Sequence, residues 1–141
     1  MAFQQNGTDI TLVAGADLSA KQFYAVKVNS SGQAVTAGAG EAAIGIVQND
    51  PASGQAGAIR VAGVSKAVAG GNVTAGAQVA ANADGKIVTA TAGRTNTNDA
   101  GSTTDALIGS NVIGVALSGG ADGEVISILV TLAGAVPTTA A

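Results

Sequence analysis

Residues 42–63, AAIGIVQNDPASGQAGAIRVAG, and residues 111–134, NVIGVALSGGADGEVISILVTLAG, present the same order of features twice in one chain. Each stretch has an Ile-Gly pair followed by a β-branched residue, then a turn-rich middle and a strand-like run that ends in Ala-Gly. Gly45 aligns with Gly114 at an offset of 69 residues, and the closing runs align without a gap. The two stretches indicate that one supersecondary unit is repeated.

A second pair of matching stretches lies upstream of the first. Residues 15–37 resemble residues 70–90 once a two-residue deletion is allowed, and each stretch contains an Asn-x-x-Gly turn between two strand-like runs. A β-unit with a single apolar face cannot bury that face alone, so we expect the two units to close on each other. The paired turn residues are Asn29 with Asn82 and Gly32 with Gly85.

The periodicity of the apolar residues is that of β-strands. In residues 126–132, ISILVTL, apolar side chains alternate along one face, and β-branched residues suit a pleated surface. Turn-forming clusters rich in Gly, Asn and Asp recur along the whole chain, and glycines interrupt every Ala-rich stretch. This spacing predicts an all-β fold, a small β-barrel or sandwich built from two similar β-units with extended N- and C-terminal arms.

The repeat also predicts the domain organisation. We expect one β domain over residues 8–133. The Ile-Gly glycines are expected at a bulge or a close approach of two backbones, and the turn glycines at positive φ. The remaining bounds are internal repeats over 15–62 and 70–131, a polar Asn/Thr-rich surface-loop insert over 91–112, an N-terminal arm over 1–7 and a C-terminal tail over 134–141.

The composition limits the possible functions. Only 11% of the 141 residues are charged, and Phe3, Phe23 and Tyr24 are the only aromatics. Small side chains bury little apolar area, so we expect a marginal core that gains stability from oligomerisation or docking. The formal net charge is −3 and the six basic residues are scattered, which argues against nucleic-acid binding. The most apolar run, 125–136, is too short to cross a bilayer as a helix.

The chemistry of an enzyme is missing from the sequence. It contains no cysteine and no histidine, the residues most used as nucleophile, general base or zinc ligand. Ser65 and Lys66 are adjacent in a strand, where neighbours point to opposite faces. Asp122 and Glu124 lie in a turn and are expected to be two solvated acids. We therefore expect no enzyme activity, no cofactor and no metal site, and we see no secretory signal in the first ten residues.

Several stretches resemble the capsid cement, or head decoration, proteins of tailed bacteriophages. These are the opening strand LSAKQFYAVKV (18–28), the run GIVQNDPASGQAGAIRVAGVSKAVAG (45–70) and the late run IGVALSGGADGEVISILV (113–130), within an Ala/Gly-rich chain. The resemblance implies a small β-barrel-like protein without an active site. It also implies a homotrimer on the capsid exterior that clips neighbouring major capsid protein subunits together, after synthesis in the host cytoplasm.

The function expected from this resemblance is structural: the protein would decorate the outside of a phage capsid and cement the shell. We take the polar N-terminal arm as the candidate capsid or intersubunit contact, namely Phe3, Gln4, Gln5 and Asn6. A virion surface adhesin or fibre-base module that binds host glycans through the 91–112 insert is the alternative. A small enzyme is the weakest possibility. The insert itself can be a lattice contact, a host-facing tip or a spacer.

Overall fold

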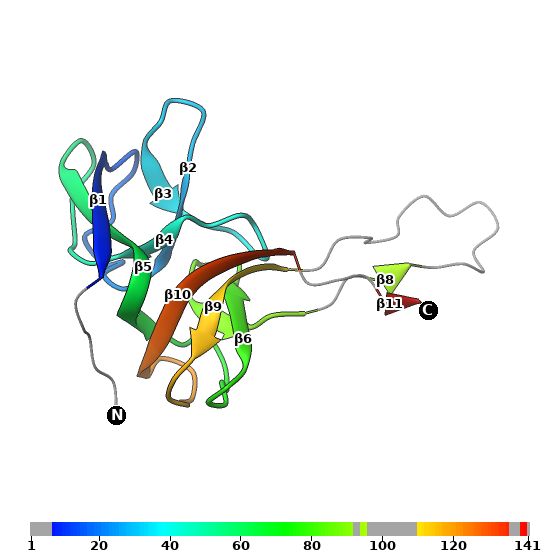
Figure 1. The fold of residues 1–141 in the computed structure, drawn as a ribbon. Helices are drawn as coiled ribbons and strands as arrows, with labels where there is room; N and C mark the ends of the chain where they lie inside the picture. Colours follow the sequence, from blue (N-terminus) through cyan, green and yellow to red (C-terminus); the bar gives the residue numbers. More distant parts are fainter. Residues whose placement is uncertain (1–6, 92–93, 96–109, 136–138, 141) are drawn as a thin grey trace.

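The computed structural model describes residues 7–91, 94–95, 110–135 and 139–140, and it confirms the all-β fold class. Every regular element in these residues is a strand (Figure 1). The strands are β1 (Thr8–Val13), β2 (Ala25–Val28), β3 (Ala34–Thr36), β4 (Gly45–Val47), β5 (Ala56–Val68), β6 (Gln78–Ala81), β7 (Ile87–Thr89), β8 (Arg94–Thr95), β9 (Asn111–Ala116), β10 (Val125–Ala135) and β11 (Thr139–Ala140).

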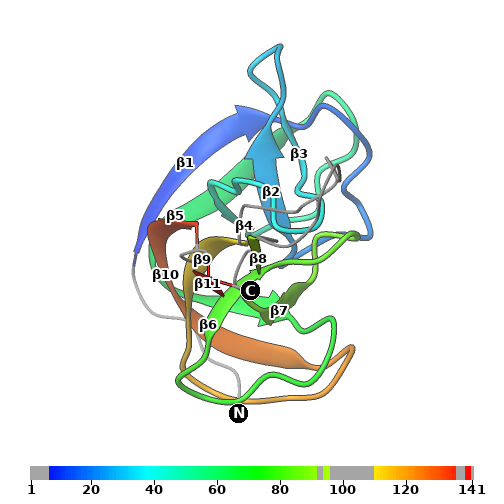
Figure 2. The same cartoon turned by 90° about the vertical axis from the view of Figure 1, so that its right-hand side faces the viewer.

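Nine of these strands form one continuous sheet in the order β3-β2-β4-β5-β10-β9-β6-β7, with β1 added on β5. The sheet is strongly curled, and Figure 2 shows it wrapping into two groups of strands that meet along β5 and β10. Each group curls until its ends meet at a single parallel bridge, Ala14 with Ala34 in one group and Ala69 with Ile87 in the other. The short pair β8 and β11 stands apart from this sheet.

The long strand β5 belongs to both groups. Its first half, residues 56–62, pairs with β1 and β4, whereas its second half, residues 63–68, pairs with β10. Gly63, at the junction, has a φ of 102°, a conformation that disfavours any residue with a Cβ. We call residues 8–62 the first unit and residues 63–131 the second unit.

Strand pairing in the two units follows one pattern. Val13 pairs with Ala56 in the first unit, and Val68 pairs with Val125 in the second, so the second half of β5 takes the place of β1. A residue of the first unit and its equivalent in the second unit are 55 positions apart in the sequence for β1, 53 for β2 and β3, and 69 for β4 and the first half of β5. The equivalent strands are β1 and the second half of β5, β2 and β6, β3 and β7, β4 and β9, and the first half of β5 and β10.

The Ile-Gly glycines sit where two backbones approach closely, as expected. A Cβ added to Gly45 would lie 2.0 Å from the carbonyl oxygen of Arg60, and one added to Gly114 would lie 1.9 Å from that of Leu129. Neither glycine has a positive φ. The constraint is therefore contact between neighbouring strands of the sheet rather than backbone conformation.

The two Asn-x-x-Gly turns are built from the same hydrogen bonds. The Asn29 side-chain oxygen accepts the backbone N–H groups of Ser31 and Gln33 at 3.0 and 2.9 Å. The Asn82 oxygen accepts those of Asp84 and Lys86 at 2.9 and 3.0 Å. The turn glycines have φ values of 78° at Gly32 and 86° at Gly85, which confirms the expected positive φ. Asn is suited here because its short side chain can bond its own turn.

Asn82→Ala is expected to lower the free energy of unfolding by about 1–2 kcal/mol, because two backbone donors of a packed turn lose their acceptor. Asn82→Asp keeps an acceptor oxygen and is expected to retain most of the stability. Urea unfolding followed by far-UV circular dichroism measures both. Equal losses for the Ala and Asp variants would show that the amide nitrogen, not the oxygen, supports the turn.

Each unit has its own buried apolar cluster. In the first unit the cluster is small, with Leu18, Val26, Val47 and Ile59 at its centre. In the second unit it is larger, and it also takes in residues of the first unit, among them Ala25, Ala37 and Ile46. The first unit thus contributes to the core of the second, and no reverse contribution is found among the described residues.

Some expected boundaries differ from the structure. β10 runs through Ala135, two residues into the segment expected as a tail, because 134–135 pair with β9. β9 begins at Asn111, so the last two residues of the expected insert belong to the sheet. The backbone of 94–95 pairs in parallel with that of 139–140, which brings the insert and the C-terminal segment together. Residues 1–6 of the expected N-terminal arm lie outside the described residues.

Candidate functional site

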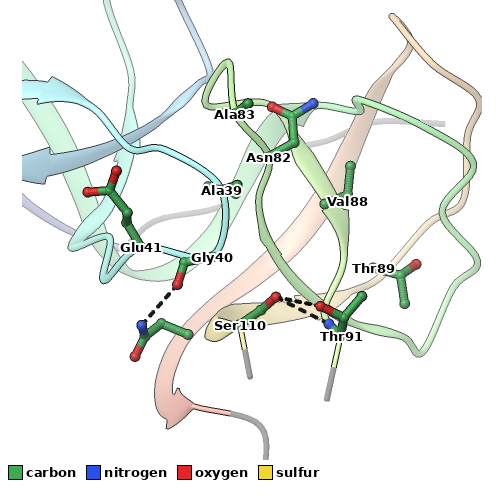
Figure 3. Close-up of a pocket in the computed structure, with 11 residues that line it drawn as sticks. Ala39, Gly40, Glu41, Asn82, Ala83, Val88, Thr89, Thr91 and Ser110 are labelled. Carbon is green, nitrogen blue, oxygen red and sulfur yellow. Dashed lines mark hydrogen bonds between the residues drawn. The ribbon is translucent and has the colours of Figure 1, made fainter. Parts of the chain in front are cut away.

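A groove of about 570 Å³ lies between the two units. The link between β3 and β4 forms one wall, and the Asn82 turn and β7 form the other (Figure 3). Thr91 and Ser110, the two ends of the insert, stand at its rim and bond each other: the Ser110 N–H donates to the Thr91 carbonyl at 2.9 Å. The lining residues are Ala39, Gly40, Glu41, Ala81, Asn82, Ala83, Val88, Thr89, Thr91, Ser110 and Asn111.

Hydrogen bonds between the units hold the groove in place. The Gly40 N–H donates to the Ala81 carbonyl at 2.9 Å, and the Gly40 carbonyl accepts the Asn111 side-chain amide at 2.9 Å. Gly40 needs a φ of 66°, so this link can reach across only with a residue that tolerates the left-handed region. The groove walls are therefore tied to both units.

The groove offers few groups for chemistry. Its one carboxylate, Glu41, forms an ion pair with Lys27. The Asn82 oxygen is used by its own turn, and the Thr91 and Ser110 hydroxyls bond each other at 3.0 Å. Among the lining residues, no hydroxyl is paired with a general base, and the groups on the walls are small hydrogen-bonding ones.

Asp17 is a titratable group that lies outside the groove. The pKa of Asp17 is lowered because the Ser19 side chain, and then the Ser19 backbone N–H at 3.0 Å, hydrogen-bond its carboxylate in an exposed turn. Within the described ranges, no cluster of three or more His, Cys, Asp or Glu could hold a metal ion. The described part of the chain also contains no helix able to span a membrane.

The side chains of the two residue pairs considered in the sequence analysis contact other partners. Ser65 is buried and accepts the Gln48 side-chain amide at 2.9 Å, whereas the Lys66 ammonium lies 5.8 Å from the centre of the Phe23 ring. Glu124 accepts the Ala121 N–H of its own turn at 2.9 Å. The carboxylate of Asp122 is instead 4.0 Å from the Lys86 ammonium. Neither pair forms a catalytic arrangement.

The predicted contact residues cannot be placed. Phe3, Gln4, Gln5 and Asn6 all lie outside the described residues. Their assignment as a capsid or intersubunit contact therefore stays a prediction.

The outer face of the second unit carries apolar side chains that sequence reasoning missed. Leu117, Val125 and Leu129 are 41%, 44% and 38% exposed. Val64, half-buried, pairs directly with Leu129 across β5 and β10. We call Val64, Leu117, Val125 and Leu129 the apolar sheet face. On the same face, Lys66 pairs with Ser127 between the Val64–Leu129 and Val68–Val125 pairs, so one cation interrupts the apolar side chains. Exposed apolar side chains on one sheet face are a feature of interaction surfaces.

The first unit carries an ion pair at the equivalent place. Asp9 and Arg60 pair in the register that Val64 and Leu129 occupy in the second unit. The Arg60 guanidinium donates to both carboxylate oxygens of Asp9, at 2.7 and 3.2 Å. The duplicated position is therefore charged in one unit and apolar in the other, so the apolar pair is not a requirement of the shared fold.

Comparison with known proteins finds a similar fold among solved structures. No protein-family model matches this chain, and no curated protein matches it. Among solved structures, it is similar to the N base of head fiber gp8.5 of bacteriophage phi29, with a TM-score of 0.57 and 15% sequence identity. The match covers 88% of this chain and 93% of that chain. At this identity the similarity shows a shared fold, and it extends over both units.

Proposed function

We propose that this chain is a structural protein of a phage virion that docks on the exterior of the capsid. The observation that carries the proposal is the fold shared with a phage head-fibre base over 88% of the chain. The groove chemistry and the apolar sheet face both favour binding over catalysis. The resemblance of the sequence to capsid cement proteins is independent of the fold comparison and supports the same class.

Within this class we propose the role of a cement protein. Homotrimers made in the host cytoplasm would bind the expanded shell and bridge neighbouring major capsid protein subunits. The apolar sheet face is the surface we assign to the capsid, since burial of Val125 and Leu129 would add to docking. Many identical copies on one shell would multiply a weak contact through avidity, and docking would stabilise a small core by mass action.

Co-sedimentation tests the proposal. Purified protein is mixed with expanded heads that lack it, and the pelleted protein is measured over a range of concentrations. Binding that saturates at a stoichiometric ratio to the major capsid protein is expected. Protein that stays in the supernatant at every concentration, while the heads pellet intact, would contradict the capsid role.

A second candidate is a fibre-base module or adhesin that binds host glycans. The observation that favours it is the groove at the root of the insert, with hydroxyls and amides from Thr91, Ser110 and Asn111 on its wall. The structural neighbour is itself named as the base of a head fibre. A glycan array probed with the full chain distinguishes the two: specific glycan binding without binding to heads favours the adhesin.

The N-terminal arm is tested by deletion. Removal of residues 2–7 is expected to weaken binding to heads by about tenfold while the melting temperature changes little, since loss of one apolar anchor, Phe3, from an interface has that magnitude. Head binding is measured by co-sedimentation and stability by far-UV circular dichroism. If the truncated protein saturates heads with unchanged affinity, the arm is not the contact.

A further inference from the structure

The two units contact each other through different surfaces, and the first unit covers one edge of the second. The Val68 N–H on the outer edge of β5 donates to the Phe23 carbonyl at 3.1 Å, and the Ala25 N–H donates to the Gly85 carbonyl at 2.8 Å. Ile46 of the first unit is fully buried in the core cluster of the second. The covering residues are Phe23, Ala25, Ala37 and Ile46.

Phe23, one of the covering residues, has an unusual backbone conformation at the contact between the units. Its φ is 67°, a rare conformation for a bulky residue, and the equivalent residue of the second unit is a glycine, Gly76, with a φ of 90°. The ring of Phe23 packs against the core of the second unit. The strain is thus tolerated where the side chain closes the contact between the units.

The first unit covers one edge of the second unit, but the equivalent edge of the first unit is exposed. Ile10, Val13 and Val28 are 39%, 46% and 43% exposed, although their equivalents Ser65 and Ala81 are 0% and 2% exposed and Val68 is half-buried. Leu12, Ile44 and Val61 are half-buried where their equivalents Ala67, Ile113 and Val130 are buried. Gly32 is exposed and a Cβ there would meet nothing within 4 Å, whereas its equivalent Gly85 is packed against the first unit.

The complementary surface is exposed on the second unit. Gly76 and Gln78, equivalent to Phe23 and Ala25, are exposed, and Ala90 and Val115, equivalent to Ala37 and Ile46, are half-buried. One chain therefore exposes a second copy of each of the two surfaces that meet in the contact between its units. We call Gly76, Gln78, Ala90 and Val115 the free covering surface. The free covered edge consists of Ile10, Leu12, Val13, Val28 and the Gly32 turn.

We propose that the free covering surface of one copy docks on the free covered edge of a second copy and repeats the contact between the two units. By equivalence, the Gln78 N–H would donate to the Gly32 carbonyl of the next copy, and the Val13 N–H of that copy to the Gly76 carbonyl. Because the two surfaces differ, the contact is head-to-tail and forms a ring or an extended assembly. The inference rests on the self-association part of the proposed function and does not depend on capsid binding.

Sedimentation velocity and native mass spectrometry of the purified full chain, without heads, test the proposal. The wild type is expected to form assemblies of three or more copies. Val13→Lys is expected to raise the concentration needed for assembly by about tenfold or more, since a charge replaces an apolar side chain at the contact. Leu132→Lys is the matched control: Leu132 is an apolar side chain of β10 that is 51% exposed, and it belongs neither to these two surfaces nor to the apolar sheet face.

Mixing two variants tests the head-to-tail geometry. Gln78→Pro removes the proposed N–H donor at the first residue of β6, a strand position that tolerates proline. Gln78→Ala keeps the donor and is its control. At the lowest concentration at which the wild type assembles, Val13→Lys and Gln78→Pro are each expected to be monomeric. Their mixture is expected to form a 1:1 heterodimer through the one intact pair of surfaces. Melting curves of the monomers establish that both variants fold.

Several results would overturn the proposal. A wild-type monomer at all concentrations would do so, as would a two-fold dimer that neither variant disturbs. Assembly that appears only after removal of residues 2–7 would mean that the chain's own N-terminal segment occupies the edge. A wild-type monomer that still binds heads to saturation would overturn this inference and leave the capsid role standing, because the assembly assay contains no heads.

Discussion

Gly114→Ala is expected to lower the free energy of unfolding by about 3 kcal/mol, which is a large part of the stability of a domain of this size. The new Cβ would lie 1.9 Å from the carbonyl oxygen and 2.9 Å from the carbonyl carbon of Leu129. These are backbone atoms of β10, which pairs with both β5 and β9, so the clash cannot be relieved by a side-chain rotation. Urea unfolding followed by far-UV circular dichroism gives the value.

Gly71→Ala is the matched control for this substitution. A Cβ at Gly71 would meet only Val88 Cγ1, at 3.9 Å, and its φ is not positive. Its free energy of unfolding is expected to change by about 0.5 kcal/mol or less. Similar values for the two variants would show that β10 can move away from β9, and the account of the Ile-Gly pair as a close backbone approach would be wrong.

The double variant Val64→Asp with Leu129→Arg is expected to lower the affinity for heads about 100-fold while the protein stays folded. It reproduces in the second unit the Asp9–Arg60 pair that the first unit carries in the same register. Two apolar groups at the centre of the proposed capsid contact become charges that would have to be desolvated. The net charge of the chain is unchanged, so a loss of binding cannot arise from overall charge.

Co-sedimentation with heads gives the affinity, and the melting temperature reports the fold. The reciprocal variant, Asp9→Val with Arg60→Leu, is the control because it alters the first unit and keeps the four side chains of the apolar sheet face. It also removes the hydrogen bond that the Arg60 guanidinium donates to the Val64 carbonyl at 2.8 Å, so its melting temperature is compared with that of the wild type. It is expected to bind heads as the wild type does. Wild-type affinity in the Val64→Asp, Leu129→Arg variant would place the capsid contact on another surface.

The equivalence of the two units could be read from local patterns. The glycine of each Ile-Gly pair, the asparagine of each turn and the alternation in 126–132 depend on neighbours within a strand or a turn. Gly45 and Gly114 therefore have the same close contact, and Asn29 and Asn82 the same hydrogen bonds.

The candidate surfaces were harder to recognise from the sequence. Val64 and Leu129 are apolar residues in strands, and such residues are ordinarily expected to be core. A comparison with Asp9 and Arg60, at the offsets of the repeat, is the one signal that could have marked them as unnecessary for the fold. The groove could not be foreseen, because its walls come from the link at Gly40 and from Ser110, which are far apart in the sequence.

The sequence by itself determined the β class, the twofold repetition of a β-unit, the turn glycines and the lack of cysteine and histidine. These follow from side-chain periodicity, backbone freedom and residue chemistry, which act over a few residues. Only the tertiary structure decided that β5 serves both units and that the first unit covers the second. Burial depends on what lies against a strand, so Val13 and Val68 occupy equivalent positions yet one is exposed and the other is covered.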